Sequence, residues 1–178
     1  MLKHYLLAPG PTPVPAEILL SMAAPIIHHR SPDFLPVLDS AKKGLQWLYQ
    51  TKNDVLILSS TGTGGMVGAV KNFFNQGDEV LVVNGGKFGE RWTKICQAYG
   101  LKVEEIVVEW GYAVKPEEVE ERLKKNKNLK GVFVQASETS TGVYHDIQTL
   151  SSIVRKYEDT LFVVDAISAL VAHDLRTD

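Results

Sequence analysis

The sequence predicts an α/β fold in which a mostly parallel sheet carries helices on both faces. Short apolar runs recur along the chain, and segments with helical spacing of apolar residues separate them. Strands that are apolar throughout belong to sheets covered on both sides, and regular alternation with helices is typical of parallel strands. The apolar runs and the alternation together favour this class over an all-α or all-β fold.

Each expected element follows from its local pattern. Apolar runs predict strands at 55–58, 80–83, 102–108, 132–134 and 161–164. Apolar residues three and four apart predict helices at 34–49, 64–74, 90–99, 116–125 and 147–157. Gly100 follows one helix as a stop signal, and Pro116 suits the first turn of another.

The first fifty residues differ from the rest. Proline occupies positions 9, 11, 13 and 15, and a proline at every second position forces an extended path. We therefore expect two parts: an N-terminal arm and helix at 1–50, and the sheet domain at 51–178.

Composition narrows the function classes. The chain has 178 residues and a net charge of −2, which suits a soluble domain and predicts neither a nucleic-acid nor a membrane partner. Cys96 is the only cysteine, so no internal disulfide forms, and a reducing, cytoplasmic location is expected. Its apolar helical position predicts a buried side chain rather than a reactive thiol. We expect no metal site.

A glycine-rich loop at 59–66 follows the first predicted strand and opens a helix. Glycines let the backbone approach a ligand, and free N–H groups at a helix start attract anions. Thr61 and Thr63 add hydroxyl groups. The loop lacks the Gly-Lys-Ser/Thr of a Walker loop, and Val67 stands where a dinucleotide fingerprint has its third glycine. Either a phosphate site or a tight strand-to-helix turn explains it.

Three further loops follow predicted strands. Phe88 lies between glycines, either as a ring that stacks on a flat ligand or as a core anchor. Residues 137–142 gather hydroxyls around Glu138, either at a ligand or as a cap. Asp165 ends an apolar run, so a partner for a buried acid, or a turn that it caps, is expected.

These loops fall together at the carboxyl ends of parallel strands, where open α/β sheets bind ligands. An anion cradle, an aromatic plate, hydroxyl donors and an acid suit a planar, phosphorylated, basic ring. Pyridoxal phosphate is such a ring, and an aspartate on its ring nitrogen makes it an electron sink.

Several motifs in a fixed order resemble class V aminotransferases, most closely the alanine–glyoxylate and serine–pyruvate branch. The resemblance runs from about residue 5 to the end of the chain. It is carried by Ala8 to Pro15, His29 to Phe34, Gly62 to Met66, Glu138 to Gly142 and Val164 to Ser168.

The resemblance implies a pyridoxal phosphate enzyme with a PLP-dependent transferase-like large domain. By position, Thr63, Gly64 and Gly65 are expected to hold the phosphate. Phe88 is expected to stack on the ring, where the family often has Trp or Tyr.

The same resemblance assigns the rest of the pocket. Thr139 is expected near the ring hydroxyl, and Asp165, the expected catalytic residue, at the ring nitrogen. Ile167 is expected on the opposite ring face. Gly10 and Pro11 resemble the segment that closes over the substrate. The family forms homodimers, so a homodimer is expected.

The family's Schiff-base lysine lies some two dozen residues beyond the position of Asp165, and its small C-terminal domain follows. We therefore expect the sequence to be the N-terminal half of a larger enzyme, with a large domain incomplete at its C-terminus. The full-length protein is expected to transfer an amino group from alanine or serine to glyoxylate or pyruvate. The chain alone is expected to be inactive and to bind the cofactor weakly.

Two alternatives stay open. The first is a related enzyme, a cysteine desulfurase or a 2-aminoethylphosphonate transaminase. Phe88 disfavours a desulfurase, because desulfurases usually have a histidine there. The second is a non-catalytic domain that keeps the fold for assembly or binding.

Overall fold

The computed structural model describes residues 6–178, which form two compact units. The first consists of residues up to Val55 together with Arg176–Asp178, and the second is Leu56–Leu175.

The first unit contains two helices, α1 (Ala16–Met22) and α2 (Phe34–Tyr49), and neither has a buried residue. Sequence patterns predicted α2 with its observed bounds but did not predict α1. The proline segment before α1 contains no regular helix or strand. Asp178 closes this unit, because its carboxylate accepts hydrogen bonds from Thr51 Oγ1 at 2.6 Å and from the Lys52 amide at 2.9 Å.

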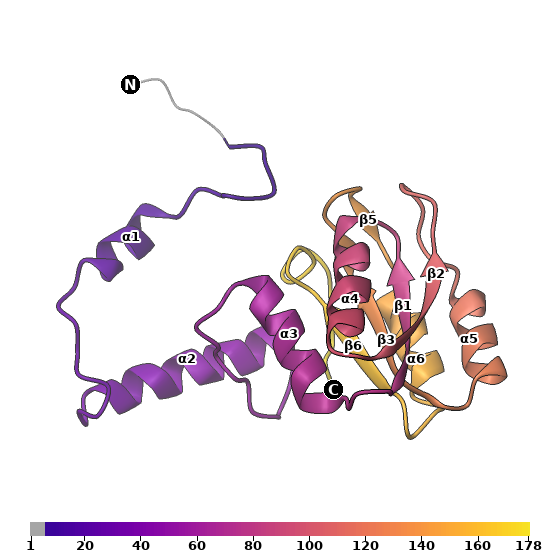
Figure 1. Cartoon of the computed structure of the whole chain (residues 1–178). Helices are drawn as coiled ribbons and strands as arrows, with labels where there is room; N and C mark the ends of the chain where they lie inside the picture. The colour runs from indigo at the N-terminus through magenta and orange to yellow at the C-terminus, as the bar shows by residue number, and fades with distance from the viewer. Residues whose placement is uncertain (1–5) are drawn as a thin grey trace. The chain divides into compact units, whose positions relative to one another are not determined.

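The second unit is built on a four-stranded sheet in the order β2-β1-β3-β6, in which every pairing is parallel (Figure 1). The predicted α/β class is therefore confirmed. Its strands are β1 (Glu79–Asn84), β2 (Lys102–Val107), β3 (Leu129–Gln135) and β6 (Leu161–Asp165). A short antiparallel hairpin, β4 (Ser137–Glu138) with β5 (Val143–Tyr144), follows β3.

Helices cover both faces of the sheet. Successive strand residues point to opposite sides, so each strand offers apolar side chains to the helices on both faces. Val80 and Val82 pack with α3 (Gly62–Phe73) and α4 (Lys87–Ala98). Leu81 and Val83 pack with α5 (Pro116–Lys125) and α6 (Ile147–Val154). Cys96 is fully buried on α4, and burial raises its thiol pKa to about 12, so the predicted packing role is confirmed.

One predicted strand is wrong. Residues 55–58 form no strand, and the side chains of Leu56, Ile57 and Leu58 are 80%, 59% and 60% exposed. A strand is stable only when a neighbour satisfies its backbone groups, and within residues 6–178 no strand pairs with this run. Apolar content alone therefore did not place it in the sheet.

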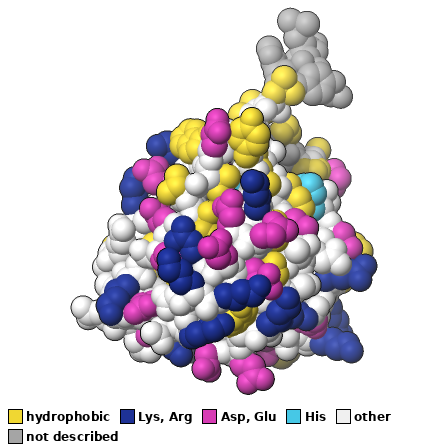
Figure 2. Space-filling view, turned by 90° about the vertical axis from the view of Figure 1, so that its right-hand side faces the viewer, with side chains coloured by type: hydrophobic (Ala, Val, Ile, Leu, Met, Phe, Trp, Pro, Cys, Tyr) yellow, Lys and Arg dark blue, Asp and Glu magenta, His cyan; other side chains and the backbone are white. Residues whose placement is uncertain are grey.

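The surface over α5 carries basic and acidic side chains in alternation (Figure 2). Lys124 and Lys156 both pair with Glu120 there, at 3.0 Å and 3.3 Å. Across the described residues, no helix is long and apolar enough to cross a membrane.

Candidate functional site

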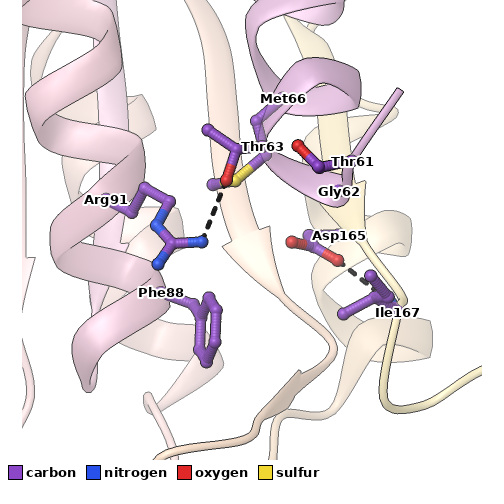
Figure 3. Close-up of a pocket in the computed structure, with 8 residues that line it drawn as sticks. All are labelled: Thr61, Gly62, Thr63, Met66, Phe88, Arg91, Asp165 and Ile167. Carbon is purple, nitrogen blue, oxygen red and sulfur yellow. Dashed lines mark hydrogen bonds between the residues drawn. The ribbon is translucent and has the colours of Figure 1, made fainter. Parts of the chain in front are cut away.

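A pocket of about 180 Å³ lies where α3 and α4 begin and β6 ends (Figure 3). All of its lining residues belong to the second unit: Thr61, Gly62, Thr63, Met66, Phe88, Arg91, Asp165 and Ile167. The volume is below the 300–1,000 Å³ of typical small-molecule sites. We take these residues as the candidate site.

The glycine-rich loop forms the start of α3, two residues earlier than the pattern predicted. Thr61 caps the helix, because its Oγ1 accepts a hydrogen bond from the Gly64 amide at 3.3 Å. The first amides of a helix have no partner inside it, so the N–H groups of Gly62 and Thr63 remain suited to an anion. The loop is therefore the capped start of a helix with no strand directly before it, and the phosphate site stays a prediction.

Gly62 packs against Ile167. A Cβ atom at this position would lie 2.8 Å from Ile167 Cδ1, closer than side-chain carbons approach. The glycine therefore lets the start of α3 lie against the segment that carries Ile167. Helix-start amides, an aromatic ring and a carboxylate around one pocket are the groups that a planar, phosphorylated, basic ring needs, so the residues present fit such a ligand.

Phe88 lies in the first turn of α4, not in a loop as predicted, because α4 begins at Lys87 rather than near residue 90. The sequence 84–89 conceals this start, because the acceptors for the helix amides come from a distant segment. Glu138 Oε2 accepts from the amides of Phe88 at 3.1 Å and Gly89 at 3.0 Å, and Ser140 Oγ accepts from Lys87 N at 3.0 Å. The capping explanation of Glu138 is thus the observed one, and its carboxylate fixes the backbone that carries Phe88.

Arg91 is the basic residue of the pocket, one helical turn after Phe88. Its Nη1 donates to Thr63 Oγ1 at 3.0 Å, and its guanidinium lies 4.7 Å from the centre of the Phe88 ring. Arg91 was not among the predicted site residues. Its spacing of three residues from Phe88 on one helix was the signal that places both side chains on one face.

Asp165 lies across the pocket from Arg91 (Figure 3). It is partly exposed, so the expectation of a fully buried acid is corrected: the strand that carries it is at the edge of the sheet. Its Oδ1 accepts from the Ile167 amide at 2.9 Å, and its Oδ2 accepts from Gln135 Nε2 at 3.2 Å. Asp165 therefore both caps the following turn and presents a carboxylate to the pocket.

The other predicted site residues are placed as follows. Gly64 and Gly65 lie in the first turn of α3, beside the lining residues. Thr139 is hydrogen-bonded to Ser168, which ties its loop to the segment that carries Ile167. Gly10 and Pro11 are exposed residues of the first unit, and their predicted substrate role stays a prediction.

Met66 was not predicted as a site residue; it is buried and lines the pocket. Its helical spacing marked it as a core position, and no sequence signal separated the two roles. Among the described residues, no group of three or more His, Cys, Asp or Glu side chains is arranged to hold a metal ion.

The order of strands and helices is that of the pyridoxal phosphate-dependent transferase-like fold. The structure superposes on ureidoglycine–glyoxylate aminotransferase from Bacillus subtilis with a TM-score of 0.91 and 30% identity, over 99% of this chain and 46% of that one. Alanine–glyoxylate aminotransferase from Nostoc sp. gives a TM-score of 0.91 at 28% identity, over 98% of this chain and 46% of that one.

The chain belongs to the class V aminotransferase family, whose model matches residues 4–177. Curated relatives include the soluble hydrogenase 42 kDa subunit of Anabaena cylindrica, 42% identical over 99% of this chain and 46% of the relative. Another is serine–glyoxylate aminotransferase of Hyphomicrobium methylovorum, 37% identical over 97% of this chain and 44% of the relative. The chain thus spans about half the length of the relatives it matches.

Proposed function

We propose that this chain supplies the pyridoxal phosphate-binding part of an aminotransferase. The observation that carries the proposal is the opposed chemistry of the two ends of the pocket. Thr63, Arg91 and the start of α3 offer donors and positive charge at one end, and Asp165 offers a carboxylate at the other. Pyridoxal phosphate carries a dianionic phosphate and, apart from it, a basic ring nitrogen, which are the partners that these two chemistries suit.

The residues have distinct proposed roles. The amides at the start of α3, with the hydroxyl of Thr63, hold the phosphate. Phe88 and Ile167 enter from α4 and from the segment after β6, and they enclose the two faces of the ring. Asp165 holds a proton on the ring nitrogen. When bound there, the cofactor supplies an electron sink for cleavage at the substrate α-carbon.

For a protein of full family length, we propose transfer of an amino group from a small amino acid, alanine or serine, to glyoxylate or pyruvate. The names of the relatives support glyoxylate as acceptor, since two of them are called serine–glyoxylate and L-aspartate–glyoxylate aminotransferase. Thr139 is proposed near the ring hydroxyl, and Gly10 and Pro11 near the substrate. A cytoplasmic homodimer is part of the same proposal.

Titration of the purified chain with pyridoxal phosphate tests the cofactor assignment. Asp165→Asn removes the negative charge and is expected to weaken binding about tenfold, because hydrogen bonds to charged groups are the stronger ones. Asp159→Asn, in an exposed turn outside the pocket, is the matched control and should leave the affinity unchanged. Equal affinities for the wild-type and Asp165→Asn chains would contradict the assignment.

A second experiment tests the substrates in a version extended to the full family length. Alanine and serine are compared as donors, with glyoxylate and pyruvate as acceptors, by measuring the oxo acid and amino acid formed. Turnover with none of the four pairs would refute the substrate proposal. Release of sulfide or alanine from cysteine would favour the desulfurase alternative.

A further inference from the structure

Behind Asp165 lies a chain of three hydrogen-bonded side chains. Trp92 Nε1 donates to Gln135 Oε1 at 3.0 Å, and Gln135 Nε2 donates to Asp165 Oδ2 at 3.2 Å. Trp92 and Gln135 are 2% and 3% exposed. The hydrogen bond between Trp92 and Gln135 is therefore buried, and the one between Gln135 and Asp165 is partly buried.

The sheet register builds this arrangement. Gln135 ends β3 directly beside Asp165 at the end of β6, and the Ala136 amide donates to the Asp165 carbonyl at 2.8 Å. Neighbouring residues of parallel strands point to the same face. That face is the one covered by α4, so the indole of Trp92 reaches Gln135 from above the sheet.

The direction of the chain is fixed by donor chemistry. An indole N–H can only donate, so the Gln135 atom that faces Trp92 must be its oxygen. The Gln135 amino group then has to face Asp165 and donate to it. With the Ile167 amide on Oδ1, both oxygens of Asp165 are held as acceptors, and their remaining lone pairs are available to the pocket.

We infer that Gln135 and Trp92 are positioning residues for Asp165. They orient its carboxylate toward the pocket, because the Gln135 amino group donates to Oδ2 and holds that oxygen in place. The inference rests on the proposed function, in which Asp165 holds the ring nitrogen of pyridoxal phosphate. It assigns a role to two residues that lie outside the pocket wall.

The test compares two ligands on the purified chain: pyridoxal phosphate, and the analogue in which a ring CH replaces the ring nitrogen. The wild-type chain is expected to prefer pyridoxal phosphate about tenfold, because only that ligand engages Asp165. Gln135→Leu should reduce the preference to about twofold. Trp92→Phe keeps an aromatic ring beside Phe133 but removes the N–H, and it should reduce the preference to about threefold.

Trp110→Phe is the matched control, because it removes an indole N–H from a tryptophan that is 54% exposed. The preference should then remain that of the wild-type chain. If Gln135 and Trp92 had a purely structural role, their substitution would weaken the binding of both ligands equally, and the ratio of the two affinities would not change. If Gln135→Leu does not fold, Trp92→Phe decides.

The outcomes separate this inference from the proposed function. If Gln135→Leu and Trp92→Phe both keep the wild-type preference, the inference is overturned and the role of Asp165 is unaffected. A wild-type chain without any preference contradicts the role of Asp165 itself, and the inference falls with it. A direct readout is the ¹⁵N-¹H signal of the Trp92 indole, which should shift with pyridoxal phosphate and stay in place with inorganic phosphate.

Discussion

Replacing Glu138 with alanine should destabilise the second unit more than any substitution at its surface. The carboxylate is 1% exposed and accepts hydrogen bonds from the amides of Phe88, Gly89 and Ser140, and from Ser140 Oγ at 2.6 Å. The amide of Glu90 already has the Gly86 carbonyl at 2.9 Å, so Glu138 and Ser140 satisfy the rest of the first turn of α4.

The magnitude follows from the amides that lose their acceptor. A buried donor left without a partner costs about 1–3 kcal/mol. The amides of Phe88 and Gly89 each lose their acceptor, and the favourable interaction of a carboxylate with the helix N-terminus is lost as well. We expect the free energy of unfolding to fall by about 3–5 kcal/mol.

Urea denaturation followed by circular dichroism measures this change. Glu138→Gln keeps one oxygen acceptor and should cost less, about 1–2 kcal/mol. Ser140→Ala removes the acceptor of the Lys87 amide and the hydroxyl that donates to Glu138 Oε1, and it should cost about 1–2 kcal/mol. A loss below about 1 kcal/mol for Glu138→Ala would show that water replaces the carboxylate, and the capping argument would fail.

Two further predictions use the same denaturation assay. Gly89→Ala should cost about 2–3 kcal/mol, because a Cβ there would lie 2.7 Å from the Val83 carbonyl oxygen. Gly68→Ala in α3 would place a Cβ in ordinary contact with Leu58 Cδ1, at 3.7 Å, and should instead stabilise by about 0.5–1 kcal/mol. Equal effects of the two substitutions would refute the contact argument. Burial lowers the pKa of His145, whose Nδ1 accepts from the Val114 amide at 3.0 Å. The unfolded state then binds the proton more readily, so stability is complete above about pH 6.5 and falls as the pH drops below it, by at most about 1.4 kcal/mol per unit. His145→Gln should remove that part of the slope, and identical slopes would contradict the assignment.

Strands β1, β3 and β6 were predictable because they are mostly apolar on both faces, whereas the edge strand β2 carries Lys102, Glu104 and Glu105. β1 and β6 begin and end within one residue of the expected bounds, and β3 extends the expected run by a few residues at its start and one at its end. Residues 55–58 carry the same pattern and form no strand. Local hydrophobicity marks a segment that can be buried, and pairing partners decide whether it is.

The site was predictable where a residue acts through its own chemistry, and not where it acts through contacts distant in sequence. Thr63, Phe88, Asp165 and Ile167 line one pocket, although the strand expected before Thr63 does not form. The role of Gln135 could not be predicted from the sequence, because it depends on the register between β3 and β6 and on the indole of Trp92 in α4.

The cap on α4 also has a consequence for the order in which the chain is made. Glu138 follows Phe88 by 50 residues. At the usual rate of about 5–20 residues per second, ribosomes need roughly 3–10 s to add them. During that interval the first turn of α4 has no carboxylate to hold it, so we expect the aromatic wall of the pocket to become fixed only after β3 and the hairpin have been synthesised.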